Sequence, residues 1–112
     1  DDQTAACIGR VWEGFGYCVD PHTAVALCAL SQRPDTHFTL VASTASPYKF
    51  SSTVLRGLGR RPSQDEFENL TLLAQFLQEK PPEQLSSLRS LPLRFEQVYA
   101  RESMPDLVRG LL

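Results

Sequence analysis

The spacing of apolar residues predicts an amphipathic helix at the start of the chain. Four apolar side chains recur at intervals of three and four residues, as on one face of a helix: Ile8, Val11, Trp12 and Phe15. We expect Asp1 or Asp2 to cap the first turn, because a carboxylate accepts hydrogen bonds from the free backbone N–H groups there. Gly16 is expected to end the helix, since glycine adopts the left-handed conformation of a helix terminus without strain.

A second helix is predicted to begin where Asp20, a capping residue, is followed by Pro21 at the first helical position. Residues 24–30 of this segment are all apolar. A helix without a polar face is stable when neighbours cover it on every side, so we expect this segment to be surrounded.

Residues 38–42 are predicted to form a strand. They are rich in β-branched and aromatic residues, and their lack of alternation is typical of a buried, parallel strand. Ser46 and Pro47 then open another helix, which Gly59 is expected to end. The apolar face of that helix contains Phe50, Val54, Leu55 and Leu58.

The rest of the chain is predicted to be mainly helical. Ser63 to Glu66 has the sequence of a capping box, and we expect a helix over residues 64–79 that Pro81 terminates. If Ser63 is the cap, its replacement by alanine should cost about 1 kcal/mol. The later predictions are a short helix at 85–88, an ambiguous strand or helix at 93–99, and a terminal helix at 104–111.

These elements predict an α/β fold, with one or two strands packed by five or six helices. A single buried strand needs pairing partners, so we expect the chain to be a piece of a longer protein. The chain also begins at Asp1 rather than at a methionine. We divide it into residues 1–60, a motif-bearing part of a larger domain, and residues 61–112, a C-terminal helical segment.

Charge and cysteine content exclude several functions. The 11 basic and 13 acidic residues are mixed along the chain and give a net charge of −2, which suggests neither a nucleic-acid patch nor a membrane-binding surface. Cys7, Cys18 and Cys28 are odd in number and lack metal-site spacing, which favours reduced thiols in a cytoplasmic protein over disulfides or a metal site. The sequence shows neither a membrane span nor a signal peptide.

Candidate chemistry lies in two segments that flank the predicted strand. Residues 20–26 read Asp-Pro-His-Thr-Ala-Val-Ala, and residues 42–50 read Ala-Ser-Thr-Ala-Ser-Pro-Tyr-Lys-Phe. The second segment follows the strand with a hydroxyl-rich turn and a proline-opened helix. Open α/β sheets bind ligands at this position, where the carboxyl end of a strand meets the N-terminus of a helix. We therefore predict a binding site there.

Both segments resemble motifs in the C-terminal part of threonine synthases. The enzymes of this family depend on pyridoxal phosphate and have fold type II. Residues 20–24 are similar to the family's Asp-Pro-His-Thr-Ala motif, and residues 44–50 to its Thr-Ala-x-Pro-x-Lys-Phe motif. Residues 2–17 resemble the helix that leads into the first motif. The resemblance implies pyridoxal phosphate as cofactor and the conversion of O-phosphohomoserine to threonine and phosphate by the complete enzyme.

The resemblance also implies roles for individual residues. Thr44 aligns with a hydroxyl that contacts the ring nitrogen of the cofactor in related enzymes, so it is the predicted cofactor-binding residue. The predicted substrate-binding or pocket-wall residues are Asp20, His22, Thr23, Ser46 and Lys49. Each also has a simpler structural explanation, such as helix capping by Asp20 and Ser46. Ser46 stands where many relatives carry histidine.

No catalytic or metal-binding residue is predicted. In the family, the lysine that binds the cofactor lies far upstream, and Lys49 belongs to a different motif. The six glycines are isolated or lie at helix ends, so they offer no loop for the cofactor's phosphate. The expected partners are therefore the remainder of the enzyme chain and a small phosphorylated amino-acid substrate.

Two other functions stay open. One is a phospho-lyase that eliminates phosphate from phosphothreonine-like substrates and releases a keto acid. The other is a non-enzymatic fragment that binds a partner through exposed apolar helices, an idea favoured by the missing cofactor-binding lysine.

Overall fold

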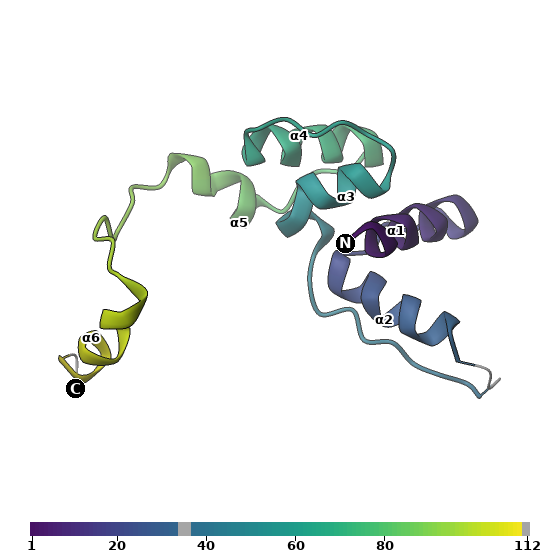
Figure 1. Ribbon diagram of the computed structural model, residues 1–112. Coiled ribbons are helices and arrows are strands. Elements are labelled where there is room, and N and C mark those ends of the chain that lie inside the picture. Colours follow the sequence, from purple (N-terminus) through teal and green to yellow (C-terminus); the bar gives the residue numbers. More distant parts are fainter. Residues whose placement is uncertain (34–36, 111–112) are drawn as a thin grey trace.

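The computed structural model describes residues 1–33 and 37–110, and its regular elements are all helical (Figure 1). The α-helices are α1 (Asp2–Phe15), α2 (Pro21–Ser31), α3 (Ser51–Gly57), α4 (Glu66–Leu77), α5 (Glu83–Ser86) and α6 (Met104–Gly110). The 3-10 helices are η1 (Pro47–Phe50), η2 (Ser87–Ser90) and η3 (Arg101–Ser103). None of the helices in the described ranges is long and apolar enough to cross a membrane.

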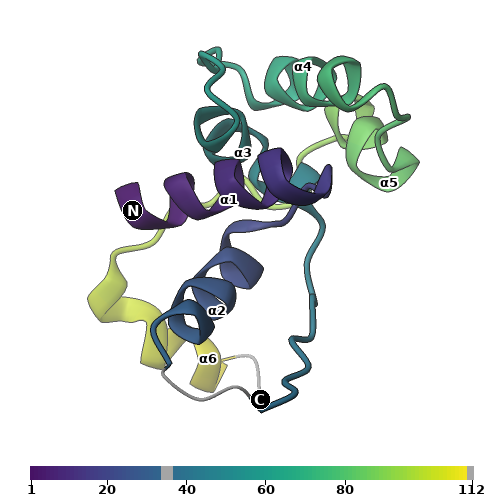
Figure 2. The ribbon, with the colours of Figure 1, turned by 90° about the vertical axis from the view of Figure 1, so that its right-hand side faces the viewer.

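The body of the molecule is built from α1 to α4. α1 packs against both α2 and α3, and α3 packs against α4, so α1 lies between α2 and α3 (Figure 2). The buried apolar core comes from all four helices and two connections: Cys7, Ile8, Val19, Ala24, Tyr48, Val54, Leu55, Leu70, Leu73 and Ala74. The division that we placed at residue 60 falls in the connection between α3 and α4, and it stays a prediction.

Two glycines allow α1 and α3 to cross closely. A Cβ atom on Gly57 would lie 2.8 Å from the Cβ of Ile8 and 2.9 Å from the carbonyl oxygen of Ala5. A Cβ atom on Gly9 would lie 2.7 Å from the carbonyl oxygen of Gly57. Any larger residue at either position would therefore push the two helices apart.

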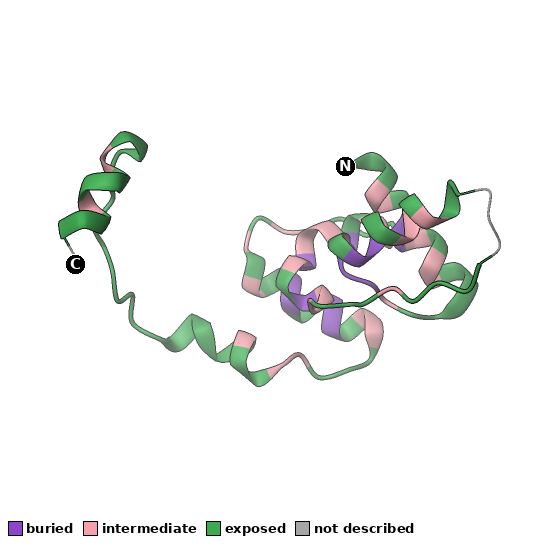
Figure 3. Cartoon of the chain, turned by 90° about the horizontal axis from the view of Figure 1, so that it is seen from below, coloured by how far each residue is buried: buried purple, intermediate pink, exposed green. Residues whose placement is uncertain are grey.

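The C-terminal part of the chain leaves this body. Residues 91–102 are all exposed, and α6 lies away from α1 to α4 (Figures 1 and 3). The radius of gyration is 17.9 Å, against about 13 Å for a compact chain of this length. Exposed apolar side chains mark this tail, including Leu93, Phe95 and Val98, which are 82–95% exposed.

Most predicted helices are confirmed, together with several of their ends. Gly16 follows α1 in the left-handed conformation, with a φ of 62°. Pro21 opens α2 after Asp20, and Ser46 caps η1. The cap predicted for the first helix is wrong in one respect, because Asp1 stands at the N-cap position but its side chain makes no capping hydrogen bond.

The α/β fold class is wrong, because the described residues contain no strand and no sheet. Residues 38–42, the predicted strand, run as an irregular segment in which Phe38 is 90% and Leu40 is 84% exposed. Their apolar character fits a strand, but a strand forms only when another segment pairs with its backbone groups. Residues 93–99, for which we left strand and helix open, form neither. Leu111, at the end of the predicted terminal helix, lies outside the described residues.

The predicted capping box is displaced by two residues. α4 begins at Glu66, and its N-cap is Asp65, whose Oδ1 accepts hydrogen bonds from the backbone N–H groups of Phe67 (2.8 Å) and Glu68 (3.4 Å). Ser63 lies outside the helix, where its hydroxyl bonds to the carboxylate of Glu68 and accepts from the N–H of Asp65. Aspartate is as good a cap as serine, so residue type alone does not favour Ser63 over Asp65.

Asp65→Ala is therefore expected to lower the free energy of unfolding by about 1 kcal/mol, the usual cost of a lost N-cap. The exposed ion pair between Asp65 and Arg89, at 3.2 Å, adds little to this value. Urea unfolding followed by circular dichroism measures the change, with Gln64→Ala, on the exposed neighbouring residue, as the control. A loss for Ser63→Ala larger than that for Asp65→Ala would contradict this assignment of the cap.

Candidate ligand-binding site at the start of α2

Asp20 is the centre of the first motif. Its side chain is buried, with 1% of the residue exposed, and it caps α2 through Oδ1. Oδ1 accepts hydrogen bonds from the backbone N–H groups of His22 (2.9 Å) and Thr23 (3.3 Å). The hydroxyl of Thr23 donates to the other carboxylate oxygen, Oδ2, at 2.5 Å. The capping role predicted for Asp20 is confirmed.

Ser43 connects the second motif to this cap. Its hydroxyl lies 3.1 Å from the hydroxyl of Thr23 and 3.4 Å from Oδ2 of Asp20. Residues 20 and 43 are far apart in the sequence, so these bonds fix the hydroxyl-rich turn against the start of α2. Sequence reasoning did not select Ser43, and the only signal for it was its place beside Thr44 in the Ser-Thr-Ala-Ser run.

The network keeps Asp20 ionised. Burial opposes the charge, but hydrogen bonds from the hydroxyl and N–H of Thr23 and from the N–H of His22, together with the electrostatic effect of the His22 side chain, outweigh it. The pKa of Asp20 is therefore below its ordinary value of 3.8. Because the folded-state pKa is the lower one, the stability that Asp20 contributes is present above the ordinary pKa. It is lost as the pH falls through the folded-state value.

Asp20→Ala is expected to lower the free energy of unfolding by about 1–2 kcal/mol at neutral pH, because it removes a buried cap and leaves the Thr23 hydroxyl without its acceptor. The difference from the unaltered chain should shrink as the pH falls below the ordinary pKa of 3.8, and should be smallest once the native carboxylate is itself protonated, below the folded-state pKa. Urea titrations over this pH range measure both effects. Asp1→Ala is the matched control, since Asp1 occupies an N-cap position without a side-chain bond. An equal loss for both variants would contradict the role of Asp20.

The structure brings together only some of the predicted site residues. Thr44 is exposed, and its hydroxyl makes no hydrogen bond within the described part of the chain. His22 is also exposed, with its ring edge-on to Phe50 at a centroid distance of 5.0 Å. Ser46 accepts from the N–H of Tyr48 at 3.3 Å as the cap of η1, and Lys49 is exposed on the same short helix.

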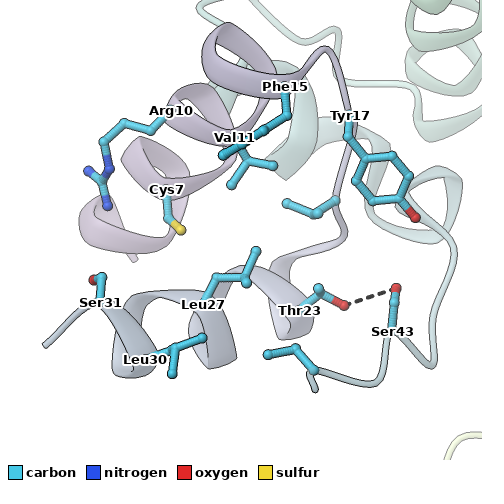
Figure 4. A pocket seen from close by; sticks show the side chains of 12 residues that line it. Cys7, Arg10, Val11, Phe15, Tyr17, Thr23, Leu27, Leu30, Ser31 and Ser43 are labelled. Atoms are coloured by element: carbon cyan, nitrogen blue, oxygen red, sulfur yellow. Dashed lines mark hydrogen bonds between the residues drawn. The ribbon is translucent and has the colours of Figure 1, made fainter. Parts of the chain in front are cut away.

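A cleft of about 740 Å³ opens beside the Asp20 network, between α1, α2 and the segment around Ser43 (Figure 4). Apolar side chains from the two helices face each other across it, with Thr23 and Ser43 at one end and Arg10 at the other. The guanidinium of Arg10 donates to the sulfur of Cys28 at 3.7 Å. The lining residues are Cys7, Arg10, Val11, Phe15, Tyr17, Val19, Thr23, Leu27, Leu30, Ser31, Val41 and Ser43.

Neither lysine of the chain lines this cleft. Lys49 lines a separate cleft between η1, α3 and α4, and Lys80 lines a third one near the end of α4. No lysine therefore stands where it would bond to an aldehyde in the α1–α2 cleft. What this region offers a ligand is an apolar wall, a charged helix cap, and the hydroxyls of Thr23 and Ser43 with that of Thr44 beside them.

Comparison with known proteins points to one family. Residues 23–108 match the family model described as threonine synthase, C-terminal. Over 84 residues the chain is 32% identical to the protein named threonine synthase-like 1 of Mus musculus. That alignment covers 73% of this chain and 11% of the relative, so the chain spans only a small part of the relative's length. The resemblance indicated by the two motifs is confirmed.

Proposed function

The chain belongs to the threonine synthase family, and on this premise we propose that it forms one wall of the cofactor pocket in an enzyme that converts O-phosphohomoserine to threonine and phosphate. The observation that carries the proposal is the placement of Thr44. The residue is exposed and its hydroxyl has no hydrogen-bond partner among the described residues, while the preceding residue, Ser43, is held by the Asp20 network. A ligand at this turn would meet a hydroxyl on a fixed backbone.

The residues present fit one part of pyridoxal phosphate, its ring nitrogen. Pyridoxal phosphate supplies an electron sink when it is bound. The hydroxyl of Thr44 is able to donate a hydrogen bond to the ring nitrogen or accept one from it, so it orients the ring without fixing its charge. Asp20 and Thr23 act through Ser43 to hold that turn, and they are positioning residues in this proposal. His22, Ser46 and Lys49 are proposed as more distant parts of the pocket wall.

The other parts of such a site would come from the rest of the enzyme chain. Neither lysine lines the cleft beside the Asp20 network, and the glycines are isolated, so the cofactor-binding lysine and the contacts to the cofactor's phosphate are assigned to that partner. Exposed apolar side chains favour a large covering partner: Val25 on α2 is 55% exposed, and Phe38 and Leu40 are more so. The cytoplasmic location expected from the cysteines stays a prediction.

Turnover by the complete protein tests the proposed reaction. Incubation with O-phosphohomoserine is expected to release phosphate and threonine in equal amounts, in a reaction that depends on added pyridoxal phosphate. Release of phosphate and a keto acid from phosphothreonine, without threonine from O-phosphohomoserine, would replace this function by that of a phospho-lyase. The absence of phosphate release from both substrates would favour a non-enzymatic binding protein.

A further inference from the structure

Two of the three cysteines lie where α1 packs against α2. Cys7 is buried, with 4% of the residue exposed, and its side chain points from α1 toward α2 (Figure 4). Cys28 belongs to α2 and is partly exposed. Both are free thiols, and the proposed function uses neither of them.

Two hydrogen bonds to α1 locate the sulfur of Cys28. Its thiol donates to the backbone carbonyl oxygen of Gln3 at 3.6 Å, and the guanidinium of Arg10 donates to the sulfur at 3.7 Å. Gln3, Cys7 and Arg10 follow one another at intervals of four and three residues, so they share one face of α1, with Cys7 in the middle. The sulfur of Cys28 therefore lies over the part of α1 from which the Cys7 side chain projects.

Helix geometry brings the sulfur of Cys7 to the same place. In an α-helix the γ atom of a side chain reaches the carbonyl oxygen four residues earlier, as serine and threonine hydroxyls do. For Cys7 that oxygen belongs to Gln3, which is also the acceptor of the Cys28 thiol. The pKa of Cys7 agrees with this arrangement, because burial raises it most and the hydrogen bond and charge of Cys28 raise it further, while Arg10 opposes the rise.

We propose that Cys7 and Cys28 form a reversible disulfide when the chain meets a hydroperoxide such as hydrogen peroxide. Cys28 reacts first, because its sulfur is partly exposed and Arg10 donates to it. As a thiolate, it attacks one peroxide oxygen and breaks the O–O bond, which gives a sulfenic acid and a hydroxide that takes up the thiol proton. The sulfur of Cys7 then attacks the sulfenic sulfur, the S–O bond breaks, and the departing hydroxide takes the Cys7 proton. Two thiols are oxidised by two electrons, and one peroxide is reduced to two waters.

Cys18 does not compete for either partner in the folded chain. It lines the cleft near the end of α4, whereas Cys7 lines the α1–α2 cleft. Burial, with a smaller contribution from Glu79, raises the pKa of the Cys18 thiol to about 11, so it is protonated and a poor nucleophile at neutral pH.

The proposed bond joins α1 to α2 beside Arg10, at the end of the α1–α2 cleft opposite to Thr23 and Ser43. The oxidation of these thiols would therefore fix the two helices that form the cleft. This modification site goes beyond the proposed enzymatic function and does not depend on pyridoxal phosphate.

Peptide mapping of the full chain after oxidation by equimolar hydrogen peroxide tests the proposal. The remaining thiols are alkylated, and the chain is cut by trypsin and by a protease that cleaves before aspartate. Arg10 lies between Cys7 and Cys18, and Asp20 lies between Cys18 and Cys28, so each cysteine leaves on its own peptide. The expected product is a Cys7–Cys28 linked peptide with alkylated Cys18, and dithiothreitol should restore all three thiols. Thiols that stay free, a link that contains Cys18, or a bond between two chains would overturn the proposal.

Oxidation in concentrated urea is the matched control, because it keeps the same thiols and removes the fold. Cys18 is nearer in the sequence to each of the other two than they are to one another, so shorter loops favour pairs with Cys18 in the unfolded chain. The share of the Cys7–Cys28 link is expected to fall several-fold in urea. The same distribution of links in urea and in buffer would show that the fold does not select this pair, and would reject the proposal.

Two serine variants supply the last arm. Cys18→Ser should give the Cys7–Cys28 link in the same yield as the unaltered chain. Cys28→Ser, at a partly exposed position, should keep the helix content by circular dichroism and lose the link, with Cys7 and Cys18 both left free. A Cys7–Cys18 link in that variant, at the yield of the original link, would show pairing without the α1–α2 geometry and would overturn the proposal.

Discussion

Gly57→Ala is expected to lower the free energy of unfolding by about 1–3 kcal/mol, the usual cost of forcing an extra methyl group into a packed interface. The new Cβ atom would stand 2.8 Å from the Cβ of Ile8 and 2.9 Å from the carbonyl oxygen of Ala5. Ile8 is fully buried, and the second contact is with backbone, so neither atom moves aside without displacing α1. The effect should appear as a lower urea midpoint.

Gly14→Ala is the matched control, because Gly14 is also helical but a Cβ atom there meets nothing within 4 Å. Alanine at this position should raise stability by about 0.5–1 kcal/mol, since it restricts the unfolded chain. Gly9→Ala should behave like Gly57→Ala, because its Cβ atom would lie 2.7 Å from the carbonyl oxygen of Gly57. Equal stabilisation by all three substitutions would contradict the close crossing of α1 and α3.

The crossing of α1 and α3 matters for the candidate site because α1 belongs both to the core and to the wall of the α1–α2 cleft. One face of α1 packs against α3 in the core, and another face forms one side of the cleft next to the Asp20 network (Figures 2 and 4). A variant that displaces α1 should therefore change the shape of that cleft as well as weaken the core.

Local signals predicted the helices well. Gly16 as a helix end, Asp20 before Pro21 and Ser46 before Pro47 each act within a few residues, so the sequence contains all the information needed. Asp65 shows the limit of such signals, because Ser63 and Asp65 are both good caps and the choice depends on the packing of α4.

Pairing and contact between distant segments were not predictable in the same way. Residues 38–42 have the composition of a strand, but composition does not supply a partner, and the segment remains irregular. The bonds from Ser43 to Thr23 and Asp20 join residues about twenty positions apart, and the crossing of Gly9 and Gly57 joins residues farther apart still. The bond from the Cys28 thiol to the carbonyl oxygen of Gln3 likewise depends on tertiary packing, so no motif indicated it.

Thr44→Val is expected to weaken the retention of pyridoxal phosphate by the complete protein by about 5- to 150-fold, the range for removal of one buried hydrogen-bond partner. Valine has nearly the shape of threonine, and residue 44 is exposed in this chain, so the fold should be unaffected. The hydroxyl is the group that we assign to the ring nitrogen. Turnover should fall together with cofactor retention, because the ring loses the contact that orients it.

The control is Thr71→Val, on the exposed face of α4, where the hydroxyl donates to the carbonyl oxygen of Phe67 at 3.1 Å. This variant removes the same group from the same residue type away from the Asp20 network. It should retain the cofactor like the unaltered protein, and circular dichroism should show equal helix content for both variants.

The dissociation constant of pyridoxal phosphate, measured by dialysis and by the cofactor's absorption band, tests the central claim most directly. The complete protein with Thr44→Val should bind the cofactor more weakly and shift the band, while Thr71→Val should do neither. An unchanged dissociation constant and an unshifted band for Thr44→Val would contradict the claim that this turn forms a wall of the cofactor pocket.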